Sequence, residues 1–366
     1  MADYDIAIIG GGPGGYVAAI RAAQLGKSVV LFERERLGGL CLNWGCIPSK
    51  ALLKNADVVN LVRDAETWGI NGVAKATFDF ASAIDRSRAV VDKVVGGVEG
   101  LMRYNGVTVV TGVASLKSTR TVACGGKDYT AAAIIIATGA SNRLLPGIQP
   151  DGKVVLTSRE ALENKTVPKR AVIIGGGPIG VEFGHLWASY GTEVTIVELL
   201  DALVPLEDAD AGRALKRSFE ARGITCLVKT RVEDVAVKGA KATVTVKGED
   251  GEKTLEADAV LLAVGFVPHT QGLDLEAAGV ATQRGFITID DHMETNVPGI
   301  YAIGDVTGKL MFAHVAMQQG VIAAEHVAGK DVPRSTTSRC PGPRSASPTS
   351  APSGTPNRPP KTPGSP

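Results

Sequence analysis

Residues 5–15 read DIAIIGGGPGG, and this stretch decides the fold class. Its first half is a short apolar run typical of a buried strand. Its second half places Gly10, Gly12 and Gly15 in the spacing G-x-G-x-x-G, which gives a tight turn, a close backbone approach to a pyrophosphate, and helix-on-strand packing. A helical segment and a second strand follow, ending at Glu33, 18 residues after Gly15. An acid there can accept a hydrogen bond from a ribose hydroxyl, so we predict a dinucleotide-binding unit.

The same pattern returns at residues 171–198. A strand over 171–174 leads into Gly175, Gly177 and Gly180, and Glu198 again lies 18 residues after the third glycine. Two such units predict two bound dinucleotides. The acid at Glu198 favours NAD over NADP, because a 2′-phosphate would require arginine there.

Two cysteines lie between these units, in the segment GGLCLNWGCIPSK at residues 38–50. Cys41 and Cys46 are either redox-active or metal-binding. No second cysteine pair and no histidines at ligand spacing accompany them, so we favour redox chemistry and predict no metal site. The five-residue step suits a distorted helix start, where one thiol meets substrate and the other faces a cofactor. Lys50 lies one helical turn beyond Cys46.

The rest of the chain alternates between strand and helix patterns, which predicts an α/β fold with parallel three-layer sheets and small antiparallel insertions. We expect helices over 79–105 and 313–328, and a hairpin over 243–256. Two short strands should meet at the Gly125-Gly126 turn. Further strands are expected over the ranges 107–110, 132–139, 259–264, 286–289 and 300–303. Three of these strands end at glycines, namely at Thr138-Gly139, Gly265 and Gly304-Asp305. At Gly139 the pattern fits either a nucleotide that approaches the backbone or a plain strand end.

Composition adds a few bounds. A chain of 366 residues with 44% hydrophobic residues should form two or three domains. The formal charge of +1 gives no reason to expect nucleic acid or a membrane surface as partner. We find no apolar run near the ~20 residues that span a bilayer and no secretory signal, and therefore expect a cytoplasmic protein.

The composition changes abruptly after Asp331. Residues 335–366 hold nine Pro, seven Ser and five Thr, with four basic and no acidic residues. Such a segment cannot bury enough apolar surface to offset its ordering entropy. We therefore predict a disordered tail over 331–366.

Taken together, the cysteine segment, both glycine patterns and the Ala137-Thr138-Gly139 and Ala302–Asp305 segments resemble the FAD-dependent pyridine nucleotide–disulfide oxidoreductases. Within that family the likeness is greatest to the dihydrolipoamide dehydrogenase group. The resemblance covers about residues 3–331. It implies a FAD-binding domain over 1–147, a NAD-binding domain over 148–271, and a central segment over 272–330 that completes the FAD domain.

The resemblance also implies roles for individual residues. The first glycine set and Glu33 would hold the ADP half of FAD, with Asp305 at the ribityl chain. The second glycine set and Glu198 would hold NAD. Cys41 would exchange with the dithiol substrate, and Cys46 would face the flavin. Lys50 would lie near flavin N5, paired with Glu182.

The implied reaction is oxidation of dihydrolipoamide, carried by a 2-oxo acid dehydrogenase complex, with transfer of electrons through the Cys41–Cys46 disulfide and FAD to NAD. The alternatives are a mercuric or glutathione reductase-like enzyme and an inactive FAD-binding fragment. Many family members have Arg where this chain has Phe266, which argues against an NADP-dependent, glutathione reductase-like enzyme. A smaller departure is Leu40, which stands where many members have Thr.

The sequence departs from the family after about residue 334. Family members are homodimers whose C-terminal interface domain supplies a His–Glu base to the partner's site, and we expect that domain to be absent here. No histidine follows His326, and His314 is expected to be a packing residue rather than a substitute base. We accordingly expect NADH-to-dye activity to exceed lipoamide activity.

Overall fold

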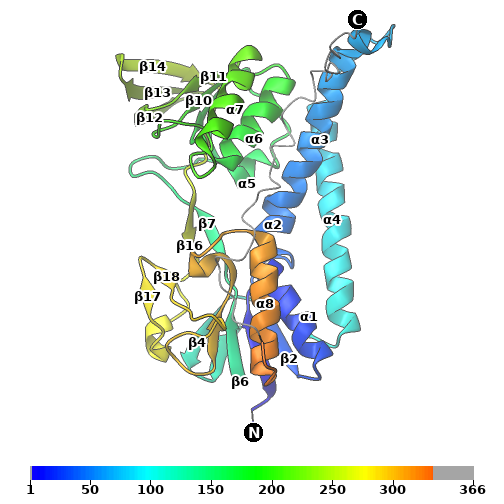
Figure 1. Ribbon diagram of the computed structural model, residues 1–366, viewed down its shortest axis with the longest axis vertical. Coiled ribbons are helices and arrows are strands. Elements are labelled where there is room, and N and C mark those ends of the chain that lie inside the picture. Colours follow the sequence, from blue (N-terminus) through cyan, green and yellow to red (C-terminus); the bar gives the residue numbers. More distant parts are fainter. Residues whose placement is uncertain (1, 333–366) are drawn as a thin grey trace, which may run out of the picture.

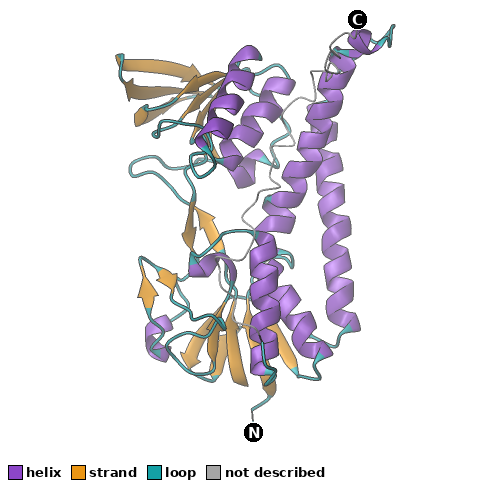
Figure 2. Ribbon diagram, viewed as in Figure 1, coloured by secondary structure: helices purple, strands orange, loops and turns teal. Residues whose placement is uncertain are grey.

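The computed structural model describes residues 2–332. Figures 1 and 2 show two α/β units stacked along the long axis, with two long helices, α3 and α4, beside them. The predicted fold class is confirmed. The predicted tail lies outside the described residues except at its start, where Val332 is buried in the first core and so does not belong to a disordered segment.

The first unit is built on a seven-stranded sheet with the order β3-β2-β1-β6-β5-β4, and β19 pairs with β6 on the parallel side. Strands β3, β2, β1, β6 and β19 run parallel, whereas β4, β5 and the start of β6 form an antiparallel extension. The strands are β1 (Tyr4–Ile9), β2 (Val29–Glu33), β3 (Thr108–Thr111), β4 (Ala114–Ser118), β5 (Thr121–Cys124), β6 (Lys127–Ile136) and β19 (Ile300–Ala302).

Both faces of this sheet are buried, as its continuous apolar strands require. On β1, Ile6 and Ile8 pack toward helices α1 (Pro13–Gln24), α4 (Phe80–Tyr104) and α8 (Ala313–Val327). Ala7 and Ile9 pack on the other side, against the antiparallel extension and the short helix η2 (Leu275–Ala278). The result is a three-layer unit whose α1 starts directly after β1.

The second unit has a five-stranded, all-parallel sheet with the order β11-β10-β9-β15-β8. Helix α6 (Pro178–Ser189) and helix α7 (Ala209–Ala221) cover one face, and an antiparallel three-stranded sheet covers the other. The strands are β8 (Val155–Thr157), β9 (Arg170–Ile174), β10 (Glu193–Val197), β11 (Thr225–Leu227), β15 (Ala259–Leu262), and in the smaller sheet β12 (Arg231–Lys238), β13 (Lys241–Gly248) and β14 (Gly251–Ala257). Helix α5 (Ser158–Ala161) follows β8.

Two short strands connect the units. The chain leaves the first unit through β7 (Ala140–Asn142) and returns through β16 (Phe266–Pro268), and the two strands pair antiparallel. The segment after β16 carries η2, the hairpin β17 (Thr282–Gln283) with β18 (Phe286–Ile287), and η3 (Gly304–Thr307). Because β19 and α8 then rejoin the first unit, the second unit is an insertion within the first.

The helix expected over 79–105 is confirmed as α4, which runs unbroken to Tyr104 through the glycines at positions 96, 97 and 100. Its buried stripe, including Val91, Val95 and Met102, packs on the first core, and this packing outweighs a glycine cost of ~1 kcal/mol each. The predicted distorted helix start at the cysteines consists of two helices, α2 (Gly39–Trp44) and α3 (Cys46–Arg63), and η1 (Ala65–Trp68) follows α3.

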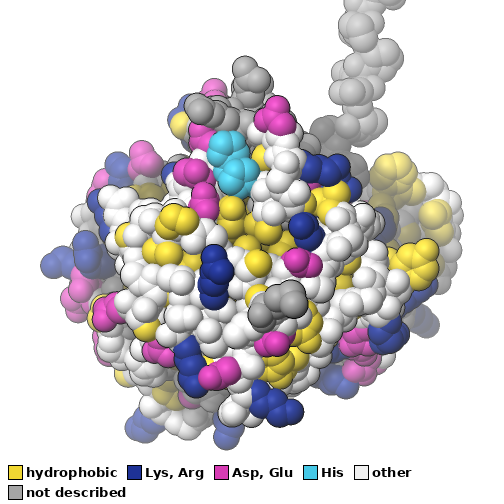
Figure 3. All heavy atoms as spheres, turned by 90° about the horizontal axis from the view of Figure 1, so that it is seen from below, with side chains coloured by type: hydrophobic (Ala, Val, Ile, Leu, Met, Phe, Trp, Pro, Cys, Tyr) yellow, Lys and Arg dark blue, Asp and Glu magenta, His cyan; other side chains and the backbone are white. Residues whose placement is uncertain are grey.

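The surface shows no single-sign charge field on the face drawn in Figure 3. Acidic and basic side chains are interspersed there with hydrophobic ones. This agrees with the formal charge of +1. In the described residues, none of the helices is both long and apolar enough to cross a bilayer.

Candidate active site

The two cysteines of the segment 38–50 form a disulfide that joins α2 to α3. Gly45 separates the two helices with an irregular backbone (φ −147°, ψ −114°). A Cβ there would lie 3.0 Å from the Leu40 carbonyl oxygen and 3.2 Å from Cys41 Cα, so any larger residue would crowd the backbone of α2. Cys41 is half-buried and Cys46 is exposed at the first position of α3. The disulfide therefore occupies a helix N-terminus, where a thiolate is stabilised.

Lys50, one turn into α3, reaches across to the second unit. Its Nζ lies 2.6 Å from Glu182 Oε1 on α6. The Lys50 side chain is 60% exposed and that of Glu182 is 23% exposed, so the pair is open to solvent on the lysine side. This contact brings together two residues 132 positions apart that the sequence analysis paired only through the family resemblance.

The first glycine turn has an open side. Gly10 adopts φ +106°, and a Cβ on Gly15 would lie 1.8 Å from the Gly10 carbonyl oxygen, so both positions require glycine for the turn itself. Around Gly12 the nearest atom to a built Cβ is Gly39 Cα at 3.8 Å. Gly12 precedes α1, so the open space lies at the positive end of that helix. The residues present thus fit a bound pyrophosphate.

Glu33 closes this turn from the end of β2. Its carboxylate accepts the backbone N–H of Gly11 at 2.8 Å through Oε2 and that of Glu35 at 2.9 Å through Oε1. Each carboxylate oxygen keeps a second lone pair. The acid is therefore fixed in position and can still accept hydrogen bonds from ribose hydroxyls.

The second turn reproduces this geometry. Gly175 adopts φ +111°, a Cβ on Gly180 would lie 1.9 Å from the Gly175 oxygen, and a Cβ on Gly177 would meet no atom within 4 Å. Buried Glu198 accepts from the N–H groups of Gly176 at 2.6 Å and Leu200 at 2.8 Å. The second unit thus offers the same open space before α6 and the same fixed acid, which fits a second dinucleotide.

The other predicted strand ends lie at two different places. Thr138 and Gly139 stand at the connection between the units, where Thr138 Oγ1 donates to the His269 carbonyl at 2.7 Å. Gly265 precedes β16 at the same connection and adopts φ +96°. Each strand end also borders a glycine turn. Thr138 Cα lies 3.1 Å from a Cβ built on Gly10, and the backbone nitrogen of Val264, next to Gly265, lies 3.3 Å from one built on Gly175.

Gly304 and Asp305 begin η3, beside α8. The Gly304 N–H donates to Gln319 Oε1 at 2.7 Å, and the buried Nε2 of Gln319 has no partner among the described residues. Burial raises the pKa of Asp305 to about 6. A half-buried carboxyl and an unpaired amide donor at one place leave polar groups that a bound polar ligand would satisfy.

The structure corrects the expectation for His314. Its side chain is exposed and stacks on Phe312 with ring centroids 5.5 Å apart, so it is not a packing residue of the core.

Sequence reasoning missed the surroundings of Trp44, which lies between the two cysteines. Its Nε1–H donates to Glu163 Oε1 at 2.8 Å, and the Arg159 guanidinium lies 3.8 Å above its ring. Arg159 also pairs with Glu35 at 3.1 Å. The position of Trp44 between the cysteines was the only signal available, because Arg159 and Glu163 come from the second unit.

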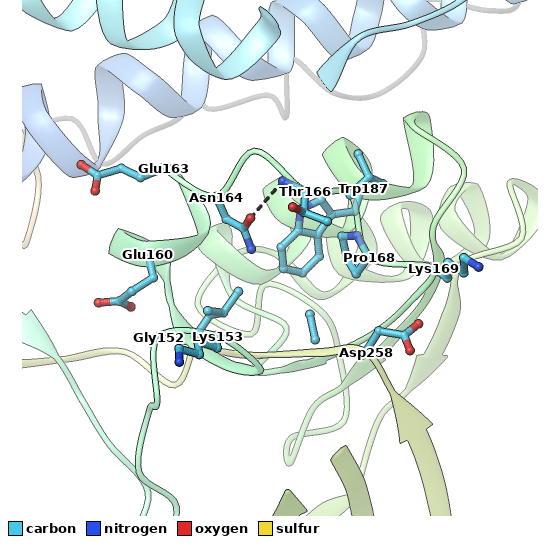
Figure 4. A pocket seen from close by; sticks show the side chains of 13 residues that line it. Gly152, Lys153, Glu160, Glu163, Asn164, Thr166, Pro168, Lys169, Trp187 and Asp258 are labelled. Atoms are coloured by element: carbon cyan, nitrogen blue, oxygen red, sulfur yellow. Dashed lines mark hydrogen bonds between the residues drawn. The ribbon is translucent and has the colours of Figure 1, made fainter. Parts of the chain in front are cut away.

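Two cavities mark the surface near this junction. A small one of about 40 Å³ lies between the disulfide segment and α6, lined by Leu40, Trp44, Gly45, Ser49, Ser158, Leu162, Ile179, Glu182, Phe183 and Phe266. A larger one of about 800 Å³ lies on the second unit (Figure 4), with Trp187 on its wall and Lys153, Glu160 and Asp258 along its rim. The larger cavity contains none of the predicted site residues. The smaller cavity lies where the disulfide segment approaches α6, the helix that follows the second glycine turn.

Comparison with known proteins shows the family of this chain. The family model described as pyridine nucleotide-disulphide oxidoreductase matches residues 4–320. A dihydrolipoyl dehydrogenase of Mycobacterium tuberculosis is 46% identical over 338 residues, which cover 90% of this chain and 72% of the relative. That of Chlorobaculum tepidum is 46% identical over 336 residues, covering 90% and 71% respectively.

Solved structures show the same similarity. LpdA from Mycobacterium tuberculosis superposes with a TM-score of 0.83 at 31% identity, covering 90% of this chain and 74% of LpdA. The HOCl-induced flavoprotein disulfide reductase RclA from Escherichia coli gives a TM-score of 0.79 at 29% identity, covering 90% and 72%. The family model matches most of the chain, the relatives are similar over 90% of it, and the two cysteines form a disulfide. The chain therefore belongs to the pyridine nucleotide-disulphide oxidoreductase family.

Proposed function

We propose that this chain acts as a dihydrolipoyl dehydrogenase, oxidising a dihydrolipoyl group and reducing NAD through FAD. The observation that carries the proposal is the Lys50–Glu182 contact, which joins the disulfide helix to the helix after the second glycine turn. An enzyme that passes electrons from a dithiol to a nicotinamide needs its redox disulfide and its nicotinamide site adjacent to one cofactor. The names of the relatives favour the dihydrolipoyl substrate.

FAD is assigned to the first unit. Gly10, Gly12 and Gly15 would hold the pyrophosphate, Glu33 the ribose, and Asp305 the ribityl chain, with Thr138, Gly139 and Gly304 nearby. When bound, FAD supplies a carrier of two electrons between the disulfide and the nicotinamide. Lys50 would place a cation near its reactive ring, where it stabilises negative charge.

NAD is assigned to the second unit, on Gly175, Gly177, Gly180 and Glu198, with Gly265 at the edge of the site. Both oxygens of Glu198 accept backbone N–H groups, so the carboxylate is fixed in place. A 2′-phosphate would meet this fixed negative charge. That repulsion favours NAD over NADP.

The chemistry of the chain's own residues is thiol–disulfide exchange. One substrate thiolate attacks Cys41 Sγ, the Cys41–Cys46 bond breaks, and Cys46 leaves as a thiolate. The second substrate thiol then attacks the substrate sulfur of the mixed disulfide, which releases Cys41 as a thiol and the substrate as a cyclic disulfide. The dithiol has lost two electrons and two protons, and the cysteine pair holds the electrons. Cys46, at the N-terminus of α3, would hold the electron pair as a thiolate beside FAD, which accepts electrons when bound.

The partner follows from the substrate. We infer that the substrate is dihydrolipoamide carried by a 2-oxo acid dehydrogenase complex, as the resemblance implies. A glutathione or mercuric reductase-like activity is the competing hypothesis.

The test uses the full chain loaded with FAD. We expect NADH to reduce the bound flavin and dihydrolipoamide to reduce the disulfide, measured by thiol titration in a single turnover. Cys46→Ser should abolish the reaction with dihydrolipoamide and keep NADH-dependent dye reduction. Faster reaction with NADPH than with NADH, or with glutathione than with dihydrolipoamide, would overturn the proposal.

A further inference from the structure

Helices α3 and α6 carry three polar contacts in sequence, which we call the α3–α6 ladder. Lys50 faces Glu182 at 2.6 Å, Asp57 Oδ1 faces His185 Nε2 at 3.6 Å, and Asn60 Nδ2 donates to Ser189 Oγ at 2.9 Å. Residue numbers increase together on the two helices, so the helices run in the same general direction. On each helix the three residues lie within one broad face, because steps of three, four and seven residues return to the same side. The proposed catalytic contact is thus the first of three.

The middle contact involves a buried histidine. His185 is 1% exposed, and its Nδ1 lies 2.8 Å from a guanidinium nitrogen of Arg222, at the end of α7. An arginine only donates, so Nδ1 must accept and the ring proton resides on Nε2. That N–H points toward Asp57 and has no hydrogen-bond partner within the described part of the chain. The neutral imidazole therefore stands between a guanidinium of the second unit and a carboxylate of α3.

Ser189 completes the ladder from the same face of α6. Its hydroxyl donates to the His185 carbonyl at 2.8 Å and accepts from Asn60 of α3. Both Ser189 and His185 are 1% exposed. Buried polar contacts of this kind fix one relative position of two helices, because any slip leaves polar groups unpaired.

The two ends of the ladder matter for the reaction. Helix α3 begins at Cys46, and α6 begins directly after Gly177. The relative position of the two helices therefore sets the distance between the disulfide and the site assigned to NAD. A misplacement of about 1 Å at a reacting centre can cost ~10²-fold in rate.

We propose that His185 is a positioning residue, which holds α3 and α6 in the register that brings Lys50 against Glu182 and aligns the NAD site with the disulfide. Asp57 and Arg222 act through it. The expected effect on the reaction rate rests on the proposed function. The relative position of α3 and α6 does not depend on which dithiol is the substrate.

The principal variant is His185→Phe, which keeps a ring of similar size and removes both nitrogen contacts. We expect the rate constant for reduction of bound flavin by NADH to fall about tenfold. His185→Gln, whose side-chain amide can still donate toward Asp57, should recover most of that loss. The milder Asp57→Asn variant keeps an acceptor oxygen but removes its charge, and should lower the rate constant about threefold.

The matched control is Thr192→Val. Thr192 is buried in the second unit just beyond α6, and its Oγ1 donates to the Pro168 carbonyl at 2.7 Å without contacting α3. It should lower Tm without changing the rate constant. Equal rate losses in the control and in His185→Phe at matched Tm would overturn the positioning role, as would an unchanged rate constant in both His185→Phe and Asp57→Asn.

A structural readout separates the two proposals. Hydrogen–deuterium exchange of the α6 amides should rise in His185→Phe relative to the Thr192→Val control. If exchange rises in His185→Phe but the wild-type chain does not react with NADH, the proposed function fails and the positioning role stands. If α6 exchange is the same in the two variants, the positioning role fails whatever the activity.

Discussion

Lys50 Nζ lies 2.6 Å from Glu182 Oε1, and this single contact joins the helix that begins at the redox disulfide to the helix that follows the second glycine turn. The two residues come from different units and are separated by 132 positions. Each unit presents its own glycine turn and its own acid. This contact, the two other polar contacts between the same helices, and the apolar packing of Leu52 and Ala56 bring the cysteine helix onto α6.

The first prediction concerns Glu182. Glu182→Gln removes the charge that balances Lys50 while keeping the side-chain size, so we expect about tenfold slower reduction of the flavin by NADH, with unchanged FAD content. Stopped-flow absorbance measures the rate. Asp85→Asn is the control, because it breaks an exposed ion pair with Lys165, also 2.6 Å long, away from the site. A rate in Glu182→Gln equal to that of the control would contradict the role of this contact.

The second prediction separates a glycine needed for folding from one needed for binding. Gly15→Ala would place a Cβ 1.8 Å from the Gly10 oxygen, so we expect little soluble protein. Gly12→Ala has room for its methyl group and an ordinary φ of −71°, so the chain should fold, but the methyl would fill the space assigned to the pyrophosphate. We expect at least tenfold weaker FAD binding, measured by fluorescence titration of the stripped protein. Wild-type affinity in Gly12→Ala would place the pyrophosphate elsewhere.

The third prediction applies the same logic to the second unit. Gly177 has φ −74° and no atom within 4 Å of a built Cβ. Gly177→Ala should therefore leave FAD content and Tm at wild-type values and raise KM for NADH about tenfold. Steady-state dye reduction at varied NADH gives KM. An unchanged KM for NADH would show that NAD does not approach this turn.

The fourth prediction concerns acid stability. Burial, and secondly the Arg222 guanidinium, lower the pKa of His185 from 6.5 to about 4. Between these values the unfolded chain binds a proton that the folded chain does not, so stability is lost as pH falls through this window. About 2.5 pH units at ~1.4 kcal/mol each give a loss of about 3 kcal/mol. Urea unfolding of the FAD-loaded chain at pH 7 and pH 4 should show this loss reduced in His185→Gln, and equal losses in both proteins would refute it.

Much of the fold could be read from local sequence signals. Gly10 and Gly175 stand in glycine patterns that follow apolar runs, and a strand–turn–helix unit formed at each. The hairpin turn at Gly125-Gly126 and the strand at 300–302 were also predicted from the local sequence, because turns and buried strands depend on nearby residues. The helix α4 was also expected from the sequence, and its packing on the core outweighs the cost of its three glycines.

The sequence by itself determined the two dinucleotide turns, their closing acids Glu33 and Glu198, and the cysteine pair, because each depends on residues within about 30 positions of one another. Only the tertiary structure decided what stands across from Cys46 and Lys50. The contacts of Glu182, His185 and Arg159 with the first unit join residues more than 100 positions apart, and no local period encodes such pairs. They arise from burying the faces of α3 and α6 against each other, which is a property of the packed units and not of either segment.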